Sequence, residues 1–120
     1  MTWTNFSRDE FACGCGCETN EIKNETIDLA QEIRDEVGFA MPITSGYRCG
    51  KHPIEARKAK PGTHAKGLAF DVGVSGGKAR LVTQALLRRS AGGVGVNQKG
   101  KGRFVHGDLD PARIGLFWTY

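Results

Sequence analysis

Two short stretches constrain the fold of this chain most, because each places metal-ligating side chains on a strand-like pattern. His64 precedes the segment 67–74, in which Asp71 alternates with apolar residues, and His106 lies in a second such segment, 103–109. In an extended strand, side chains two residues apart share a face of the sheet. Two imidazoles and a carboxylate, with a fourth position left to water, are a ligand set of catalytic zinc ions. The three residues therefore predict a zinc site on one face of a sheet.

The remaining pattern predicts an α+β fold in a single domain spanning residues 1–120. Apolar residues at helical spacing predict helices over 24–37, with Asn24 as N-cap and Gly38 as C-cap, and over 78–89. Ser7 and Glu10 fit a capping box at the start of a short helix. The other expected elements are a short helix plus loop in 51–62, strands at 41–44, 67–74, 94–96 and 103–109, a hairpin at 97–102, and an aromatic tail, 117–120, packed on the sheet. We expect a small antiparallel sheet with the helices on one side.

Composition indicates an ordinary globular domain. The chain has 120 residues, of which 39% are hydrophobic and 25% charged. No apolar run approaches the roughly 18 residues of a membrane span, so we expect no membrane insertion. The first ten residues lack a basic start and an apolar core, which predicts no signal peptide and synthesis in the cytosol. We expect a monomer.

Charge is divided unevenly along the chain. Residues 1–47 carry nine acidic and three basic side chains, whereas residues 48–120 carry four acidic and fourteen basic ones. A basic surface attracts polyanions, so nucleic acid and an anionic cell-wall polymer are both candidate partners. The alternative is that the basic face is only solvated and binds no partner. The basic stretch 78–103 is poor in aromatic residues, which argues against stacking on single-stranded nucleic acid.

The four cysteines leave two interpretations open. Cys13, Cys15 and Cys17 alternate with glycine, and Cys49 lies far along the chain. Thiols two residues apart make poor disulfide partners, and the chain shows no export signal. A second, structural metal site on three of these thiols is conceivable, but the spacing is not one of the usual zinc-knuckle patterns. Reduced thiols are therefore the preferred interpretation, and the role and redox state of the cysteines stay open.

The run Gly62–Asp71 resembles the S-x-H-x-x-G-x-A-x-D signature of the M15 zinc peptidases. That family includes D-Ala-D-Ala carboxypeptidases and phage L-alanyl-D-glutamate endopeptidases. The resemblance extends to Ser45–Cys49 upstream, to Phe104–Asp108 downstream and to Trp118. It is closest to the short phage-type branch, and it implies a hedgehog/DD-peptidase-like fold.

This resemblance also implies site roles. It assigns Zn²⁺ to His64, Asp71 and His106, and it implies that Arg48 holds a substrate carboxylate or carbonyl oxygen near the metal. Gly62 stands where the family often has serine, which removes a hydrogen bond to the ligand loop.

The general base departs from the family pattern. Many members place Glu or Asp three residues before the last ligand, where this chain has Arg103, and some place His two residues before it, where this chain has Phe104. Asp108 is the candidate base, since it shares a strand face with His106. Its competing role is to accept a proton from an imidazole N–H and fix the tautomer.

Several other ionisable and aromatic side chains are expected to have structural rather than catalytic roles. His52 is expected to be a loop residue beside the cleft, and Glu55 to be solvated unless it supplies the missing base. A further group is expected in the core rather than on a substrate platform: Tyr47, Phe70, Phe104 and Trp118.

The expected activity is zinc-dependent hydrolysis of peptidoglycan stem or cross-link peptides by a phage-type endolysin. Without a signal peptide, such an enzyme acts on the wall after release at lysis, or as part of a virion. The alternatives are a D-Ala-D-Ala carboxypeptidase or dipeptidase, and a non-catalytic zinc-binding module such as the hedgehog domains. Nucleic-acid binding is a third and weaker hypothesis.

Overall fold

The computed structural model describes residues 2–15, 17, 19–52, 54, 62–89 and 92–120. The short helix expected within 51–62 falls mainly on residues outside these ranges. The elements, in chain order, are η1 (Arg8–Phe11), α1 (Asn24–Val37), β1 (Ile43–Ser45), β2 (Ala69–Val72), α2 (Gly76–Arg89), β3 (Val94–Asn97), β4 (Phe104–Asp108), η3 (Pro111–Arg113) and β5 (Phe117–Thr119). The α+β class is confirmed. No helix within the described part of the chain is long and apolar enough to cross a membrane.

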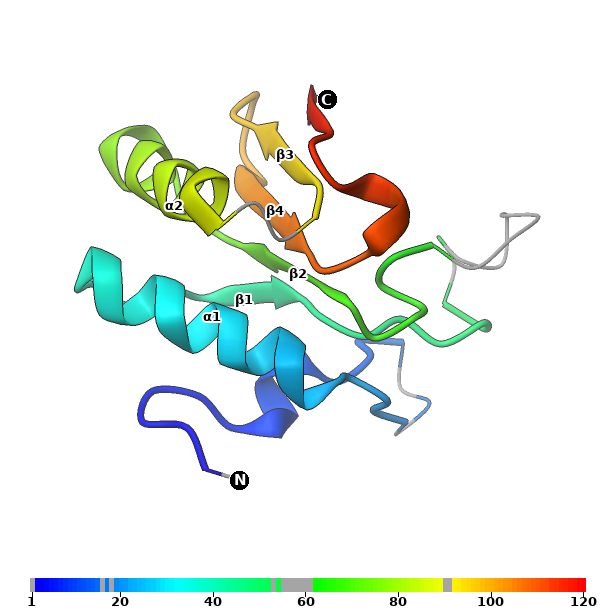
Figure 1. Ribbon diagram of the computed structural model, residues 1–120. Helices are drawn as coiled ribbons and strands as arrows, with labels where there is room; N and C mark the ends of the chain where they lie inside the picture. The colour runs from blue at the N-terminus through cyan, green and yellow to red at the C-terminus, as the bar shows by residue number, and fades with distance from the viewer. Residues whose placement is uncertain (1, 16, 18, 53, 55–61, 90–91) are drawn as a thin grey trace.

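Five strands form one mixed sheet in the order β1-β2-β4-β3-β5 (Figure 1). The pairs β1–β2, β2–β4 and β3–β4 are antiparallel, and the expected hairpin joins β3 to β4. β5 pairs with β3 in parallel, so the prediction of a purely antiparallel sheet was wrong at this edge. The physical reason lies in η3. This turn carries the chain from the end of β4 past β3, so that β5 runs opposite to β4 and therefore along β3.

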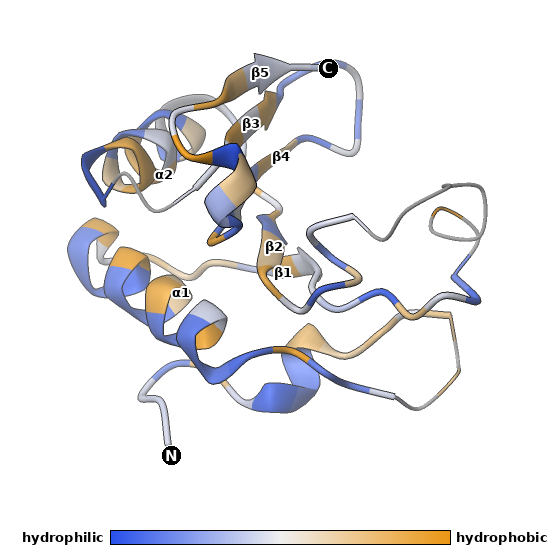
Figure 2. Ribbon diagram, turned by 45° about the vertical axis from the view of Figure 1, so that its right-hand side comes forward, coloured by the Kyte–Doolittle hydropathy of each residue, from blue (hydrophilic) through white to orange (hydrophobic). Residues whose placement is uncertain are grey.

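Both helices cover the same face of the sheet, as expected (Figure 1). Hydrophilic residues mark the outer side of α1, and its apolar residues turn inward (Figure 2). The core between helices and sheet includes the following side chains, each at most 3% exposed: Ile27, Ala30, Ile33, Phe70, Val72, Val82, Ala85, Leu86 and Val105. Burying this apolar layer is the main source of stability. It also leaves the opposite face of β2 and β4 to polar side chains.

The ends of α1 were predicted with one error. Gly38 forms the C-cap in the left-handed conformation, with φ of 77°, as expected. At the other end Lys23, not Asn24, occupies the N-cap position with extended backbone angles. Asn24 is the first helical residue, and its side-chain oxygen instead accepts a hydrogen bond of 2.7 Å from Arg8. A tertiary partner therefore displaced the local cap that the sequence suggested.

The aromatic tail joins the sheet rather than packing on its face. Residues Phe117–Thr119 form the edge strand β5, and Phe117 is 54% exposed. Trp118 points from this strand toward β4, with its ring centroid 5.2 Å from that of His106. The prediction of a packed tail was therefore correct for Trp118 and wrong for Phe117.

Asp110 connects η3 to the loop that carries His64. One carboxylate oxygen accepts a hydrogen bond of 3.0 Å from the Ala112 amide, and the other lies 2.9 Å from Lys66 Nζ. The bonds to Lys66 and to the Ala112 amide hold the pKa of Asp110 below its ordinary value. Asp110 therefore acts both as the N-cap of η3 and as half of an ion pair.

Removing the cap and removing the charge are expected to have separable effects. Asp110→Ala should lower the free energy of unfolding by about 1–2 kcal/mol, because the N-cap acceptor is lost. Asp110→Asn keeps an acceptor and should cost less than about 1 kcal/mol, since Lys66 is partly solvated. A carboxyl with a lowered folded pKa stabilises the fold above its unfolded pKa and loses that effect as the pH falls through its folded pKa. Denaturant titrations should thus show the wild type and Asp110→Asn converging in strong acid. A constant gap at every pH would exclude the ion-pair contribution.

Candidate metal centre

Three separate elements bring His64, Asp71 and His106 together. Asp71 on β2 and His106 on β4 are directly paired across the antiparallel ladder. His64 lies in the turn that precedes β2, which is fixed to α1 because the Gly67 carbonyl accepts hydrogen bonds from the Thr26 hydroxyl and the Lys23 amide at 2.8 and 3.0 Å. The face shared by Asp71 and His106 is the one turned away from the helices.

The donor atoms converge on one point. The distance from His64 Nε2 to Asp71 Oδ1 is 3.3 Å, and that from His106 Nδ1 to the same oxygen is 3.0 Å. One atom from each residue lies within 4.8 Å of the others, and the three residues are only 5%, 5% and 3% exposed. Ligands at about 2.0–2.2 Å from a tetrahedral zinc ion lie about 3.3–3.5 Å apart. The spacing and the N/N/O donor set therefore fit a zinc ion.

Partners on the far side of each ring set the imidazole tautomers. His64 Nδ1 lies 2.7 Å from the carbonyl oxygen of Gly46, which only accepts, so Nδ1 donates and Nε2 keeps its lone pair. His106 Nε2 lies 2.8 Å from Asp108 Oδ2, so its Nδ1 is the atom turned toward Asp71. Such outer hydrogen bonds are usual for metal-ligating histidines. In the neutral imidazole that metal binding requires, the remaining lone pair of each ring therefore faces the same point.

The surroundings of Asp71 and His106 favour the charged form of each side chain. Burial raises the pKa of Asp71, but its interactions with the His106 and His64 rings outweigh burial and hold that pKa below its ordinary value. Burial likewise disfavours the imidazolium form of His106, but hydrogen bonds to Asp108 and Asp71 outweigh it and raise that pKa. Asp71 is therefore ionised throughout the physiological range, as a metal ligand must be.

The Asp108 carboxylate is buried in the protein interior and is not exposed to solvent. The residue is 1% exposed, and its Oδ2 contacts His106. Its Oδ1 accepts hydrogen bonds of 2.9 and 3.1 Å from the Gly93 and Asp110 amides. Both oxygens are therefore engaged inside the protein.

A cleft of about 440 Å³ opens over the three residues. Arg48 lies on its wall, with Nη2 3.6 Å from Asp71 Oδ2 and Nε 3.1 Å from Ser45 Oγ. The other described residues that line the cleft are Ile54, Thr63, Phe104, Arg113, Trp118 and Tyr120. The cleft thus combines a polar floor, two guanidinium groups and an aromatic wall.

A family model described as peptidase M15 matches residues 4–108. The chain belongs to the peptidase M15 family. The match includes His64, Asp71, His106 and Asp108, whereas β5 lies beyond it. No curated protein and no solved structure shows significant similarity to the chain. Family membership identifies the chain as a peptidase, which agrees with the resemblance seen in its sequence.

The sequence did not indicate the full cleft wall of this M15 peptidase. Tyr47 and Phe70 are buried as expected, but Phe104 and Trp118 line the cleft, so their assignment to the core was wrong. Tyr120 and Arg113 also line it, and the Arg113 guanidinium lies 5.0 Å from the Trp118 ring centroid. The period-two spacing of Trp118 and Tyr120 was a usable signal, since it places both on one face of a strand. Arg113 gave none.

The structure describes only one of the two other polar residues that the sequence placed near the cleft, His52 and Glu55. The His52 Nδ1 atom accepts a hydrogen bond of 3.2 Å from the Ile54 amide, and His52 does not line the cleft, in keeping with its interpretation as a loop residue. Glu55 lies outside the described residues. Among the residues that the structure does describe, Asp71 is the only carboxylate on the cleft wall.

Proposed function

We propose that this M15 peptidase is a zinc enzyme that hydrolyses peptide bonds in the stem or cross-linking peptides of peptidoglycan, as phage endolysins do. The supporting observation is the convergence of His64 Nε2, Asp71 Oδ1 and His106 Nδ1 beneath a cleft that carries two arginines. In this proposal residues 1–120 form one domain of the hedgehog/DD-peptidase type and act as a monomer.

A zinc ion bound there would lower the pKa of a bound water to near neutrality and polarise the scissile carbonyl. The chain's own residues position the metal ligands and stabilise charge on the substrate. The β2–β4 ladder holds Asp71 and His106 in register, and outer hydrogen bonds orient the two imidazole rings. The Arg48 guanidinium lies beside Asp71, where it stabilises negative charge on a substrate oxygen or anchors a carboxylate.

The cleft wall supports a short peptide substrate with a free carboxylate. Among the described residues, Arg48 and Arg113 are the cationic groups on it, and Phe104, Trp118 and Tyr120 provide flat apolar surface. Stem peptides of peptidoglycan carry carboxylates and small aliphatic side chains. The cationic excess of residues 48–120 also suits an anionic wall polymer.

Digestion of purified peptidoglycan tests the activity and identifies the bond. Incubation with the zinc-loaded protein should release fragments with new amino termini, detected by mass spectrometry, and exhaustive chelation should stop the release. Free D-alanine as the sole product would support the carboxypeptidase alternative. Cleavage that persists without metal would exclude the zinc mechanism.

For Asp108 we propose a positioning role rather than that of general base, because both of its oxygens are engaged and neither faces the cleft. Loss of such an outer partner typically costs 10–100-fold in metal affinity. Asp108→Asn should therefore weaken zinc binding by about 10–100-fold, while kcat at saturating zinc stays within about threefold of wild type. Competition with a chromophoric chelator measures the first quantity, and a peptide assay measures the second. A large drop in kcat with unchanged zinc affinity would instead identify Asp108 as the base.

One observation favours a second candidate, a non-catalytic zinc-binding module. Apart from Asp71, the described residues place no carboxylate on the cleft wall to accept the proton of the attacking water. A zinc-loaded protein that cleaves no peptidoglycan peptide would support this alternative.

A further inference from the structure

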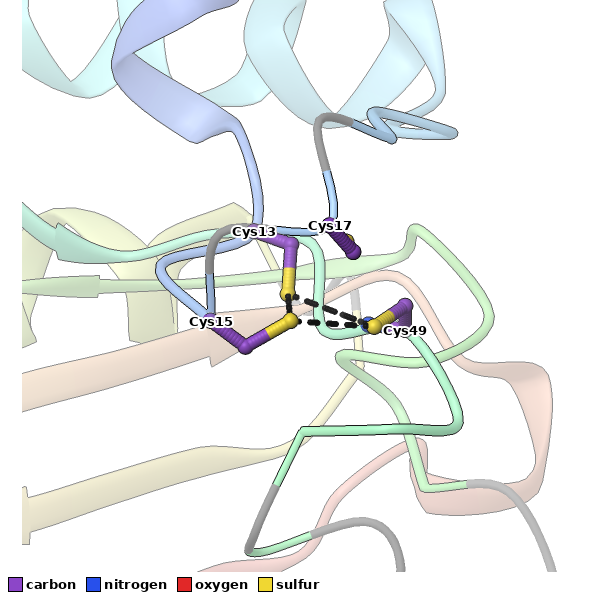
Figure 3. A group of neighbouring side chains, drawn as sticks. All are labelled: Cys13, Cys15, Cys17 and Cys49. Atoms are coloured by element: carbon purple, nitrogen blue, oxygen red, sulfur yellow. Dashed lines mark hydrogen bonds between the residues drawn. The ribbon is translucent and has the colours of Figure 1, made fainter.

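The four cysteines gather at a second place, away from the cleft. Cys13, Cys15 and Cys17 come from one loop after η1, and Cys49 from the segment after β1 (Figure 3). The sulfur of Cys13 lies 3.3 Å from that of Cys15 and 3.7 Å from that of Cys49, and the Cys15–Cys49 distance is 3.2 Å. All four sulfurs lie within 4.8 Å of one another. The tertiary structure thus brings together thiols that are up to 36 residues apart.

We infer that Cys13, Cys15, Cys17 and Cys49 bind a second, structural Zn²⁺ ion. Four thiolates at about 2.3 Å from a tetrahedral zinc ion lie about 3.8 Å apart, close to the observed sulfur spacing. Three sulfurs are mutually close, which is the arrangement of ligands around a common centre rather than of one disulfide pair. The three sulfur–sulfur distances of 3.2–3.7 Å are all longer than a disulfide bond of about 2.05 Å, and none of the four cysteines is paired in a disulfide in this structure.

Hydrogen bonds between thiols contribute little to holding the four side chains together, because the S–H group is a weak donor and sulfur a weak acceptor. Cys13 and Cys49 are each only 8% exposed, so the cluster is anchored inside the protein, while Cys15 lies at the surface. The Cys49 amide points at Cys13 Sγ from 3.4 Å. Such an N–H donor stabilises a metal-bound thiolate.

The sequence spacing alone disfavoured this site, because the fourth ligand reaches it only through tertiary packing. The backbone of Tyr47 donates a hydrogen bond of 2.7 Å to the Phe11 carbonyl, which holds the two segments side by side. Gly46 packs against the same residue so closely that an added Cβ would lie 2.5 Å from the Phe11 oxygen. Cys49 is thereby carried to the loop of the other three cysteines.

The cluster also supports the metal centre of the cleft. The segment it holds, 45–49, supplies the Gly46 carbonyl that orients His64 and also contains Arg48. The Arg48 amide donates a hydrogen bond of 3.2 Å to the His64 carbonyl. A metal ion on the four thiols would therefore fix one wall of the cleft to the N-terminal part of the chain.

Metal content and cobalt spectroscopy on the full chain, kept reduced, test this inference without any activity assay. The wild type should bind two zinc ions per chain by elemental analysis. His64→Ala/His106→Ala should retain one ion, and its cobalt-substituted form should show the intense near-ultraviolet charge-transfer band of thiolate ligands. Cys13→Ser/Cys15→Ser should also retain one ion but lose that band. Thiol reagents should react with the cysteines of the wild type only slowly until a strong chelator is added.

Several outcomes would overturn the inference. One is a wild type with a single zinc ion that disappears completely in His64→Ala/His106→Ala. Others are a cobalt form of that variant without a thiolate band, a cluster that takes up iron instead, and an intact mass showing disulfides in freshly isolated protein. If Cys13→Ser/Cys15→Ser does not fold, the cobalt spectrum of the histidine variant still decides the question. Failure of the peptidase assay would leave all of these readouts unaffected.

Discussion

Under the proposed function, the His106→Ala protein is expected to bind no zinc ion in the cleft and to cleave peptidoglycan peptides at least about 10³-fold more slowly than wild type. His106 supplies the Nδ1 atom that lies 3.0 Å from Asp71 Oδ1, and its loss also removes a buried partner from both Asp71 and Asp108. Two ligands hold zinc far more weakly than three. Elemental analysis and the rate of release of new amino termini measure the two effects.

The third histidine of the chain provides a matched control. His52→Ala removes an imidazole whose Nδ1 accepts a hydrogen bond from the nearby Ile54 amide and which does not line the cleft. Its zinc content should equal that of wild type, and its rate should lie within about twofold. Circular dichroism establishes that both variants are folded. Equal rates for His106→Ala and wild type would refute the ligand assignment.

The largest expected loss of stability is at Gly67, between His64 and Asp71. Its φ of 73° is the left-handed conformation that disfavours any side chain, and a Cβ at this position would clash with the carbonyl oxygen of Glu21. Since that neighbour is backbone, relief requires the ligand loop to move away from the segment that leads into α1. We expect Gly67→Ala to lower the free energy of unfolding by about 3 kcal/mol or more. Its zinc affinity should also fall, because the loop that carries His64 moves.

Gly38→Ala separates conformational strain from the clash. Gly38 has a similar φ of 77°, but among the described residues no atom lies within 4 Å of the position that an added Cβ would take. The substitution should cost only about 1 kcal/mol and leave zinc affinity unchanged. Urea denaturation of the three proteins gives the comparison. Similar losses for Gly67→Ala and Gly38→Ala would show that the contact with Glu21 is not tight in solution.

The local pattern of the sequence was sufficient to group the candidate ligands. Asp71 and His106 alternate with core residues such as Phe70 and Val105, and period-two geometry then leaves only one face for each polar side chain. Once the helices cover the apolar face, both polar groups must lie on the other. The direct pairing of Asp71 with His106 follows from the β2–β4 register, which sequence alone did not specify.

Local patterns did not determine the cleft wall or the role of Asp108. Trp118 and Tyr120 reach the cleft because η3 turns the chain so that β5 pairs with β3, a choice made by packing of distant segments. Asp108 shares a strand face with His106, which is compatible with either of its candidate roles. The amides of Gly93 and Asp110, from two other segments, engage its second oxygen and turn the carboxylate inward.

By itself, the sequence determined the α+β class, both long helices, the hairpin and the set of residues able to bind a metal in the cleft. These features depend on interactions between residues near one another in the chain, or on a burial pattern with a fixed period. Only the tertiary structure decided the parallel edge strand, the aromatic wall and the approach of Cys49 to the other three cysteines. Each of these depends on contacts between distant segments, whose free energy is set by how whole elements pack and not by any local run of residues.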